Sequence, residues 1–330
     1  MPHFPPPPEL PQTPGLFQCV PPAVFPPVLG LLGLVSAWTH ASRVFGLPSP
    51  LVQLVSGMVT CLFVFCTVAY VAKIIQNPRV VPQDLNTLPG RTGLSAWCIA
   101  MIVLASLLSG ISVPIAEAVL VIGGLCLLAI AAYVLPFRLR GIDPAGAMTP
   151  AMHLVFVGFI LIPGAAMPMQ MGVEAMPWLI WYCVGASIFI TVKTIRPLIF
   201  ADGAPPLRPL QAIQIAPASF IASGALLTDQ QALAAAALTW MVILLAILLV
   251  RLKWLTESPF SGFYSSFTFP VTAMISAFII GFETFNLGFL KYIGGTILIA
   301  ATLYILVIAF RILKLWANGT LAINTNAATA

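Results

Sequence analysis

The chain has 330 residues, of which 60% are hydrophobic and only 7% are charged, and its formal net charge is +5. A soluble protein of this length covers itself with roughly a quarter of charged residues, so the composition excludes a water-soluble globular protein. The basic residues lie at the edges of apolar runs and form no polar face, which excludes nucleic acid as a partner.

Two segments without apolar runs flank the chain. Residues 1–20 are rich in proline and lack the basic and apolar regions of a signal peptide, so we expect a flexible N-terminal tail. Residues 317–330 are small and polar, and we expect a flexible C-terminal tail there. Because no polar linker divides residues 21–316, we expect them to form one transmembrane domain.

Ten apolar runs approach the ~20 residues that a helix needs to cross a bilayer. In chain order they lie near 22–41, 51–75, 92–110, 114–135, 150–170, 176–195, 211–228, 231–253, 263–284 and 288–315. The sequence therefore predicts an all-α membrane protein with about ten transmembrane helices.

The basic residues test this count. With both termini in the cytoplasm, twelve of the fourteen lysines and arginines fall on the inner side, and only Arg43 and Lys291 fall outside. Cytoplasmic loops of membrane proteins carry such an excess. An error of one helix would scramble the separation, so the sequence predicts an even number of spans with cytoplasmic termini.

Proline is distributed unevenly among the expected helices. The odd-numbered ones contain Pro26, Pro27, Pro163, Pro217 and Pro270, while the even-numbered ones keep proline at their edges, and only the third helix departs from this rule. A helix-interior proline frees a carbonyl that must face protein or a water-filled cavity. We therefore expect five hairpins around a central pore, with odd helices inside and even helices against lipid. The alternative is that these prolines merely kink packed helices.

The span centres carry no charged residue, and His153 lies close to an inner helix end. The chain has no paired carboxylates within a helix, no nucleophile motif and no phosphate-binding loop, so we expect no enzyme. The six cysteines are scattered without a CxxC pair, and we expect no metal and no other cofactor. What remains is an apolar conduit for small solutes, whose expected lining comes from the odd helices: Phe25, Gly30, Phe156, Gly158, Pro163, Ala216, Pro217, Phe267, Phe269 and Pro270.

Three motifs resemble those of a known family. They are Phe25-Pro-Pro-Val-Leu-Gly30 in the first helix, Ala216-Pro217 in the seventh and Phe269-Pro270 in the ninth, with a weaker match at Pro114-Ile-Ala-Glu117. Together they resemble the tellurite-resistance/dicarboxylate transporter family, which is TehA-like and belongs to the slow-type anion channel superfamily. Pro26, Pro27 and Gln214 depart from its pattern, which leaves pore width and selectivity open.

The resemblance implies passage of small anions through a pore at the centre of ten helices, with the phenylalanine at the position of Phe269 as its gate. It also implies a homotrimer in which each protomer has its own pore. We expect a gated anion channel of the inner (plasma) membrane. Two alternatives stay open: a secondary carrier for C4-dicarboxylate, sulfite or tellurite-type anions, and a membrane scaffold that transports nothing.

Overall fold

The computed structural model describes residue 15 and residues 17–330 of the chain. Within these residues nine helical segments are long and apolar enough to cross a membrane, and a shorter apolar helical segment lies between the fourth and sixth predicted spans. All ten predicted positions are thus occupied by helix, and the protein is an all-α membrane protein. The prediction of a flexible tail over residues 1–20 lies mostly outside the described residues.

The long segments fall into two classes by burial. Four are buried over 78–83% of their most apolar stretch, and five over only 22–33%. The buried class consists of α1 (Phe25–Phe45) with η1 (Pro22–Val24), α4 (Leu88–Leu108), α10 (Ile215–Leu227) with η5 (Pro205–Gln214), and α13 (Phe269–Phe285) with η6 (Gly262–Phe267). The exposed class consists of α2 (Ser49–Gln76), α5 (Val113–Leu139), α8 (Met176–Thr194), α11 (Gln231–Val250) and α14 (Gly288–Ala317). Odd spans are inner and even spans are outer, as predicted.

The fifth span is broken into short pieces. They are α6 (Met152–Phe156), η2 (Gly158–Leu161), α7 (Ile162–Ala166) and η3 (Met167–Met169), and η4 (Val173–Ala175) leads into α8. Pro163 opens α7 and supplies no backbone N–H to the turn before it. A Cβ atom on Gly158 would lie 2.8 Å from Cδ1 of Ile99, so α4 packs directly on this backbone.

The inner prolines open α-helices and do not bend them in the middle. Pro27, Pro163 and Pro270 lie in the first turns of α1, α7 and α13, and Pro217 is the third residue of α10. The first turn tolerates proline because its N–H groups have no partner within the helix. Our expectation of mid-helix kinks was therefore wrong at these positions. The third span is also no exception, since α4 begins earlier than predicted and holds Pro89 in its first turn.

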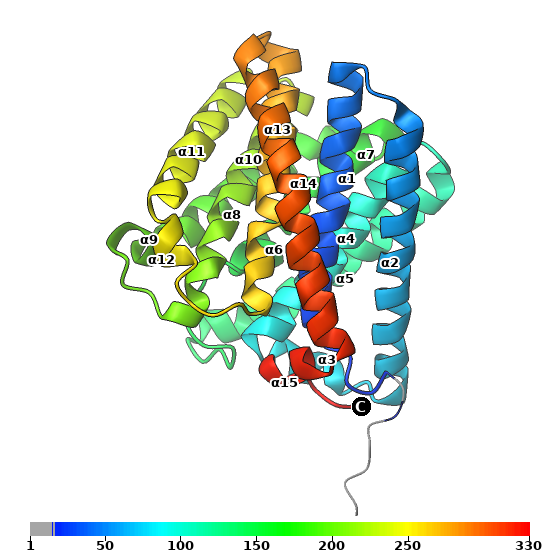
Figure 1. Cartoon of the computed structure of the whole chain (residues 1–330), viewed down its shortest axis with the longest axis vertical. Coiled ribbons are helices and arrows are strands. Elements are labelled where there is room, and N and C mark those ends of the chain that lie inside the picture. The colour runs from blue at the N-terminus through cyan, green and yellow to red at the C-terminus, as the bar shows by residue number, and fades with distance from the viewer. Residues whose placement is uncertain (1–14, 16) are drawn as a thin grey trace, which may run out of the picture.

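The inner segments form a closed ring. Helix α1 packs against α4 and α13, α13 packs against α10, and the broken fifth segment joins α4 to α10. The outer helices lie against this ring, each in contact with the inner segment that precedes it in the chain. Figure 1 shows α2 and α11 on opposite sides of the inner segments. The five hairpins predicted from the sequence are present.

The chain turns back at one end of the bundle through short helices. They are α3 (Val80–Leu85), α9 (Arg196–Phe200), α12 (Leu252–Leu255) and α15 (Thr320–Asn324). The C-terminus and the start of α1 lie at this end (Figure 1), which we call the terminal end. Lys291 lies at the opposite end, where its Nζ donates to the carbonyl of Val44.

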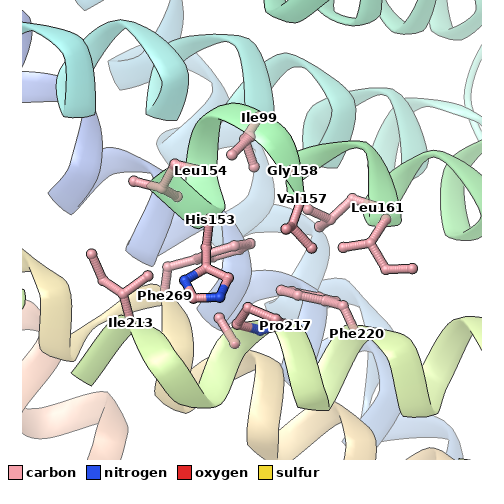
Figure 2. Close-up of a pocket in the computed structure, with 12 residues that line it drawn as sticks. Ile99, His153, Leu154, Val157, Gly158, Leu161, Ile213, Pro217, Phe220 and Phe269 are labelled. Carbon is pink, nitrogen blue, oxygen red and sulfur yellow. The ribbon is translucent and has the colours of Figure 1, made fainter. Parts of the chain in front are cut away.

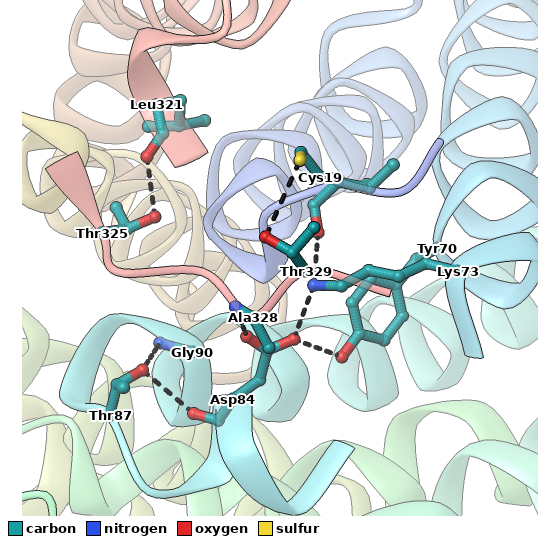
Figure 3. Close-up of polar contacts among 11 residues, drawn as sticks. Cys19, Tyr70, Lys73, Asp84, Thr87, Gly90, Leu321, Thr325, Ala328 and Thr329 are labelled. Carbon is teal, nitrogen blue, oxygen red and sulfur yellow. Dashed lines mark hydrogen bonds and ion pairs between the residues drawn. The ribbon is translucent and has the colours of Figure 1, made fainter. Parts of the chain in front are cut away.

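Residues 317–330, predicted as a tail, pack on the terminal end. The backbone N–H of Ala328 donates to Oδ1 of Asp84 over 2.8 Å, and that of Ala330 donates to the carbonyl of Gln18. Oδ2 of Asp84 accepts from Lys73 and Tyr70, and both Lys73 and Asp84 have fully buried side chains (Figure 3). The C-terminal residues therefore complete a buried ion-pair cluster. Their flexibility stays a prediction.

Candidate functional site

The ring of inner segments surrounds a small cavity of about 20 Å³. Its lining comes from α4, the broken fifth segment, η5, α10 and the start of α13 (Figure 2). The side chains around it are apolar except for one histidine: Ile99, His153, Leu154, Val157, Gly158, Ile160, Leu161, Ile213, Ala216, Pro217, Phe220 and Phe269. No lysine, arginine, aspartate or glutamate is among them.

Two aromatic rings meet in this cavity. The rings of Phe269 and Phe220 are stacked, with centroids 5.2 Å apart and an interplanar angle of 29°. Phe269 is 6% exposed, and it is the first residue of α13, separated from η6 by Thr268 alone. Hydroxyl groups on both sides fix this backbone, because Thr268 donates to the carbonyl of Ser265 and Thr272 donates to that of Phe269. The pair fills space between α10 and α13.

Glycines on α1 let α13 come this close. A Cβ atom on Gly33 would lie 2.3 Å from Oγ1 of Thr272 and 2.8 Å from Cδ2 of Phe269. A Cβ atom on Gly30 would lie 2.2 Å from Oγ1 of Thr268. Any side chain at either position would displace the start of α13. The first helix thus sets where the ring of Phe269 lies, although it lines none of the cavity.

A chain of hydrogen bonds begins at the one polar side chain of the lining. His153 places Nδ1 3.0 Å from the carbonyl of Pro150 and Nε2 3.3 Å from Oγ1 of Thr191. Thr191 donates to Oε1 of Gln214, and Nε2 of Gln214 donates to Thr194. Because Thr191 gives its only proton to Gln214, it faces His153 as an acceptor. Both ring nitrogens then face acceptors, but the ring is buried, which disfavours its charged form, and a neutral imidazole has one N–H and donates to only one of them.

Charges gather at the terminal end. The guanidinium of Arg91 makes two parallel bonds of 2.7 and 2.8 Å to the carboxylate of Asp143, and Arg138 pairs with the same carboxylate. Burial opposes the charge on Asp143, but the hydrogen bonds from Arg91 and Ala145 and the positive charges of Arg91 and Arg138 outweigh it and hold its pKa below the ordinary value. This cluster ties the first turn of α4 to the loop that follows α5.

The structure brings some of the predicted lining residues together. Phe269, Ala216, Pro217 and Gly158 line the cavity, and Pro270 follows Phe269 directly. The others lie elsewhere in the ring. Phe25 is packed between Tyr70 and Trp97, Gly30 touches Thr268, Pro163 opens α7, and Phe267 packs against Tyr264, while Phe156 is not among the cavity residues.

Eight of the twelve lining residues were not predicted, and Phe220 and His153 are the two of them that matter for the site's chemistry. Phe220 lies three positions after Pro217, on the same face of α10, and this spacing is the signal that could have identified it. His153 was placed at the helix end and assigned no role in the cavity. Because the fifth segment is broken, its ring reaches the cavity wall from that position.

Comparison with known protein families decides the identity. The family model SLAC1, described as voltage-dependent anion channel, matches residues 19–313. The chain belongs to this family. No curated protein matches the chain at a significant level.

Membership in the voltage-dependent anion channel family makes the protein a multi-pass membrane protein that passes anions as a channel or transporter. The family consists of channels and transporters, not of enzymes. The matched residues include nine long apolar helices, apart from the last four residues of α14, and the whole cavity.

Proposed function

We propose that the protein is a gated anion channel in which the stacked pair of Phe269 and Phe220 closes the central cavity. The single observation that carries the proposal is this aromatic pair inside a ring of five inner segments. A hydrophobic constriction can block ions by its bulk or by excluding water. If the Phe269 side chain rotated away from Phe220, a passage would open along the axis of the five inner segments.

The choice among anions would be made by a cavity lining that has no lysine, arginine, aspartate or glutamate. The lining offers apolar side chains and one imidazole, so it would favour small inorganic anions or oxyanions that lose their water shell easily. The excess of basic residues at the terminal end would raise the local anion concentration there. We assign this end to the cytoplasm, with both termini inside the cell, because it carries most of the lysines and arginines.

We further propose an inner (plasma) membrane location and a homotrimer with one passage in each protomer. These two assignments rest on the family resemblance. Apolar side chains on the outer helices, such as Leu303 (69% exposed) and Phe310 (68% exposed), leave a wide surface for lipid or for neighbouring copies.

The test is the anion current of Phe269→Ala in planar bilayers or oocytes. Removing the ring should raise the current about tenfold or more, since each ~1.4 kcal/mol taken from a barrier gives a factor of ten. Phe310→Ala is the matched control, because it removes the same ring from the lipid-facing surface. A well-expressed Phe269→Ala protein with the negligible current of the wild type would contradict the gate.

The second candidate is a secondary carrier for dicarboxylate, sulfite or tellurite-type anions. The observation that favours it is His153, a titratable group at the cavity wall with an acceptor for each ring nitrogen. Burial disfavours a lone charge there, so a proton and an anion would enter the site together. Uptake into proteoliposomes that depends on a pH gradient, and that loses this dependence in His153→Gln, would support the carrier.

A further inference from the structure

A second hollow lies at the terminal end, separate from the central cavity. It measures about 160 Å³ and is formed by the loop before α6, the end of α8, the start of η5 and α12. The residues that matter for its chemistry come from all four segments: Thr149, Lys193, Thr194, Arg208, Gln211 and Trp254. We call this hollow the basic cleft.

Three polar atoms around the basic cleft are buried and have no hydrogen-bond partner among the described residues. They are Oγ1 of Thr149, Oε1 of Gln211 and Nε1 of Trp254. Gln211 is only 5% exposed. A buried polar group without a partner costs roughly 1–3 kcal/mol, and three around one hollow are unusual in a folded protein. A ligand with several oxygens would accept from Thr149 and Trp254, and from Gln211 once its amide is turned so that Nε2 replaces Oε1.

The charge of the cleft is positive. Lys193 is exposed and makes no ion pair among the described residues, while Arg208 pairs with Glu257 and donates to the carbonyl of Gly203. The guanidinium of Arg208 also lies 5.0 Å from the centre of the Trp254 ring, which holds the indole in place. Two cations against one partly exposed carboxylate favour an anionic ligand.

We propose that the basic cleft binds a phosphate-type oxyanion. Trp254 and Thr149 would donate to its oxygens, and a turn of the Gln211 amide about its last bond would present Nε2 in place of Oε1. Lys193 would supply the main charge. The volume exceeds what one inorganic phosphate fills, so the natural ligand carries more than the oxyanion. A soluble phosphate ester and the headgroup of an anionic lipid share this chemistry.

The cleft is joined to the central cavity through two of its own wall residues. The carbonyl of Pro150 accepts from His153, and Thr194 accepts from Gln214, which binds Thr191 beside the same histidine. Both ends of the hydrogen-bond chain at His153 therefore lie in the wall of the basic cleft. A ligand in the basic cleft would therefore affect the position of His153. The effect of this on transport rests on the proposed function, but the binding of the ligand does not.

The experiment uses the full chain in nanodiscs of neutral lipid, with thermal unfolding as the readout. Inorganic phosphate should raise the melting temperature above that in chloride of equal ionic strength. Lys193→Gln and Trp254→Phe should each weaken the apparent phosphate affinity about tenfold. Trp254→Phe keeps an aromatic ring and removes the N–H. Lys314→Gln is the matched control, because it removes one exposed positive charge from α14 and should bind like the wild type.

A second arm separates the two sources. Nanodiscs with an anionic phospholipid should stabilise the wild type and abolish the phosphate response if the ligand is a headgroup, and should leave that response intact if the ligand is soluble. Either result supports the site, provided that Lys193→Gln reduces the stabilisation that the wild type shows with the same probe. Equal stabilisation of all four proteins, or no stabilisation by either probe, overturns the proposal. Neither outcome depends on current through Phe269→Ala.

Discussion

The central cavity and the terminal end of the same bundle carry side chains of opposite kinds. Around Phe269 and Phe220 the lining is apolar apart from His153. At the terminal end two buried clusters join Lys73 with Asp84 and Arg91 with Asp143. The ion pairs fasten an outer helix and a loop to α3 and α4 at the terminal end, while the centre carries no lysine, arginine, aspartate or glutamate that would hold or repel an anion.

The largest effect on stability is expected from Lys73→Ala. The change removes one partner of an ion pair that is fully buried on both sides and leaves the carboxylate of Asp84 without its cation. Breaking a buried pair in this way costs about 3–5 kcal/mol. Thermal unfolding in detergent measures it. A melting temperature like that of the wild type would show that the terminal end does not anchor the ring.

A smaller loss is expected from Asp143→Asn, at about 2 kcal/mol, because a bidentate charged bond to Arg91 is weakened. The effect should depend on pH. The pKa of Asp143 lies below its ordinary value, so its contribution is present above the pKa of the unfolded chain and is lost as the pH falls through the folded pKa. Unfolding curves of the two proteins should converge below about pH 4. A gap that stays constant as the pH falls well below about 4 would contradict this reading.

At the centre, Gly33→Ala tests packing and gating together. The added methyl group would meet Phe269 and Thr272, so either α1 or the Phe269 ring must move. Overpacking of this kind costs about 1–2 kcal/mol. We expect a changed anion current alongside the modest loss of stability, measured on the same preparation. An unchanged current would mean that α1 does not position the gate.

The smallest effect is expected on the outer surface. Leu303→Ala removes an exposed side chain of α14, and its stability should stay within about 0.5 kcal/mol of the wild type. The measurement is the same thermal unfolding. A large loss would indicate that this face is covered by another protein copy, which would support the homotrimer.

Much of the fold could be predicted from the sequence because each transmembrane helix is encoded by a short, continuous stretch of the chain. The hydropathy of about twenty residues identifies a transmembrane helix without knowledge of its neighbours. The two layers followed from proline, even though the structural reason differs: Pro27 and Pro270 begin helices after short 3₁₀ turns. Whether a proline starts or bends a helix depends on the turn before it, and the sequence does not show that turn.

The candidate site was predicted only where a residue belongs to a local sequence motif. Phe269 precedes a proline in a motif that can be found along the chain, whereas Phe220 has no such mark and is one of 21 phenylalanines. The basic cleft was missed altogether. Thr149, Gln211 and Trp254 are far apart in sequence and become neighbours only when the loops meet at the terminal end.

Two longer helices of the ring begin at the wall of the central cavity: α10 just before Ala216 and α13 at Phe269. The peptide dipoles of a helix add to about half a positive charge at its first turn. The positive ends of these two backbone dipoles thus lie at the cavity wall. Such a field would draw an anion to the centre and release it again, since no ammonium or guanidinium group is there to hold it.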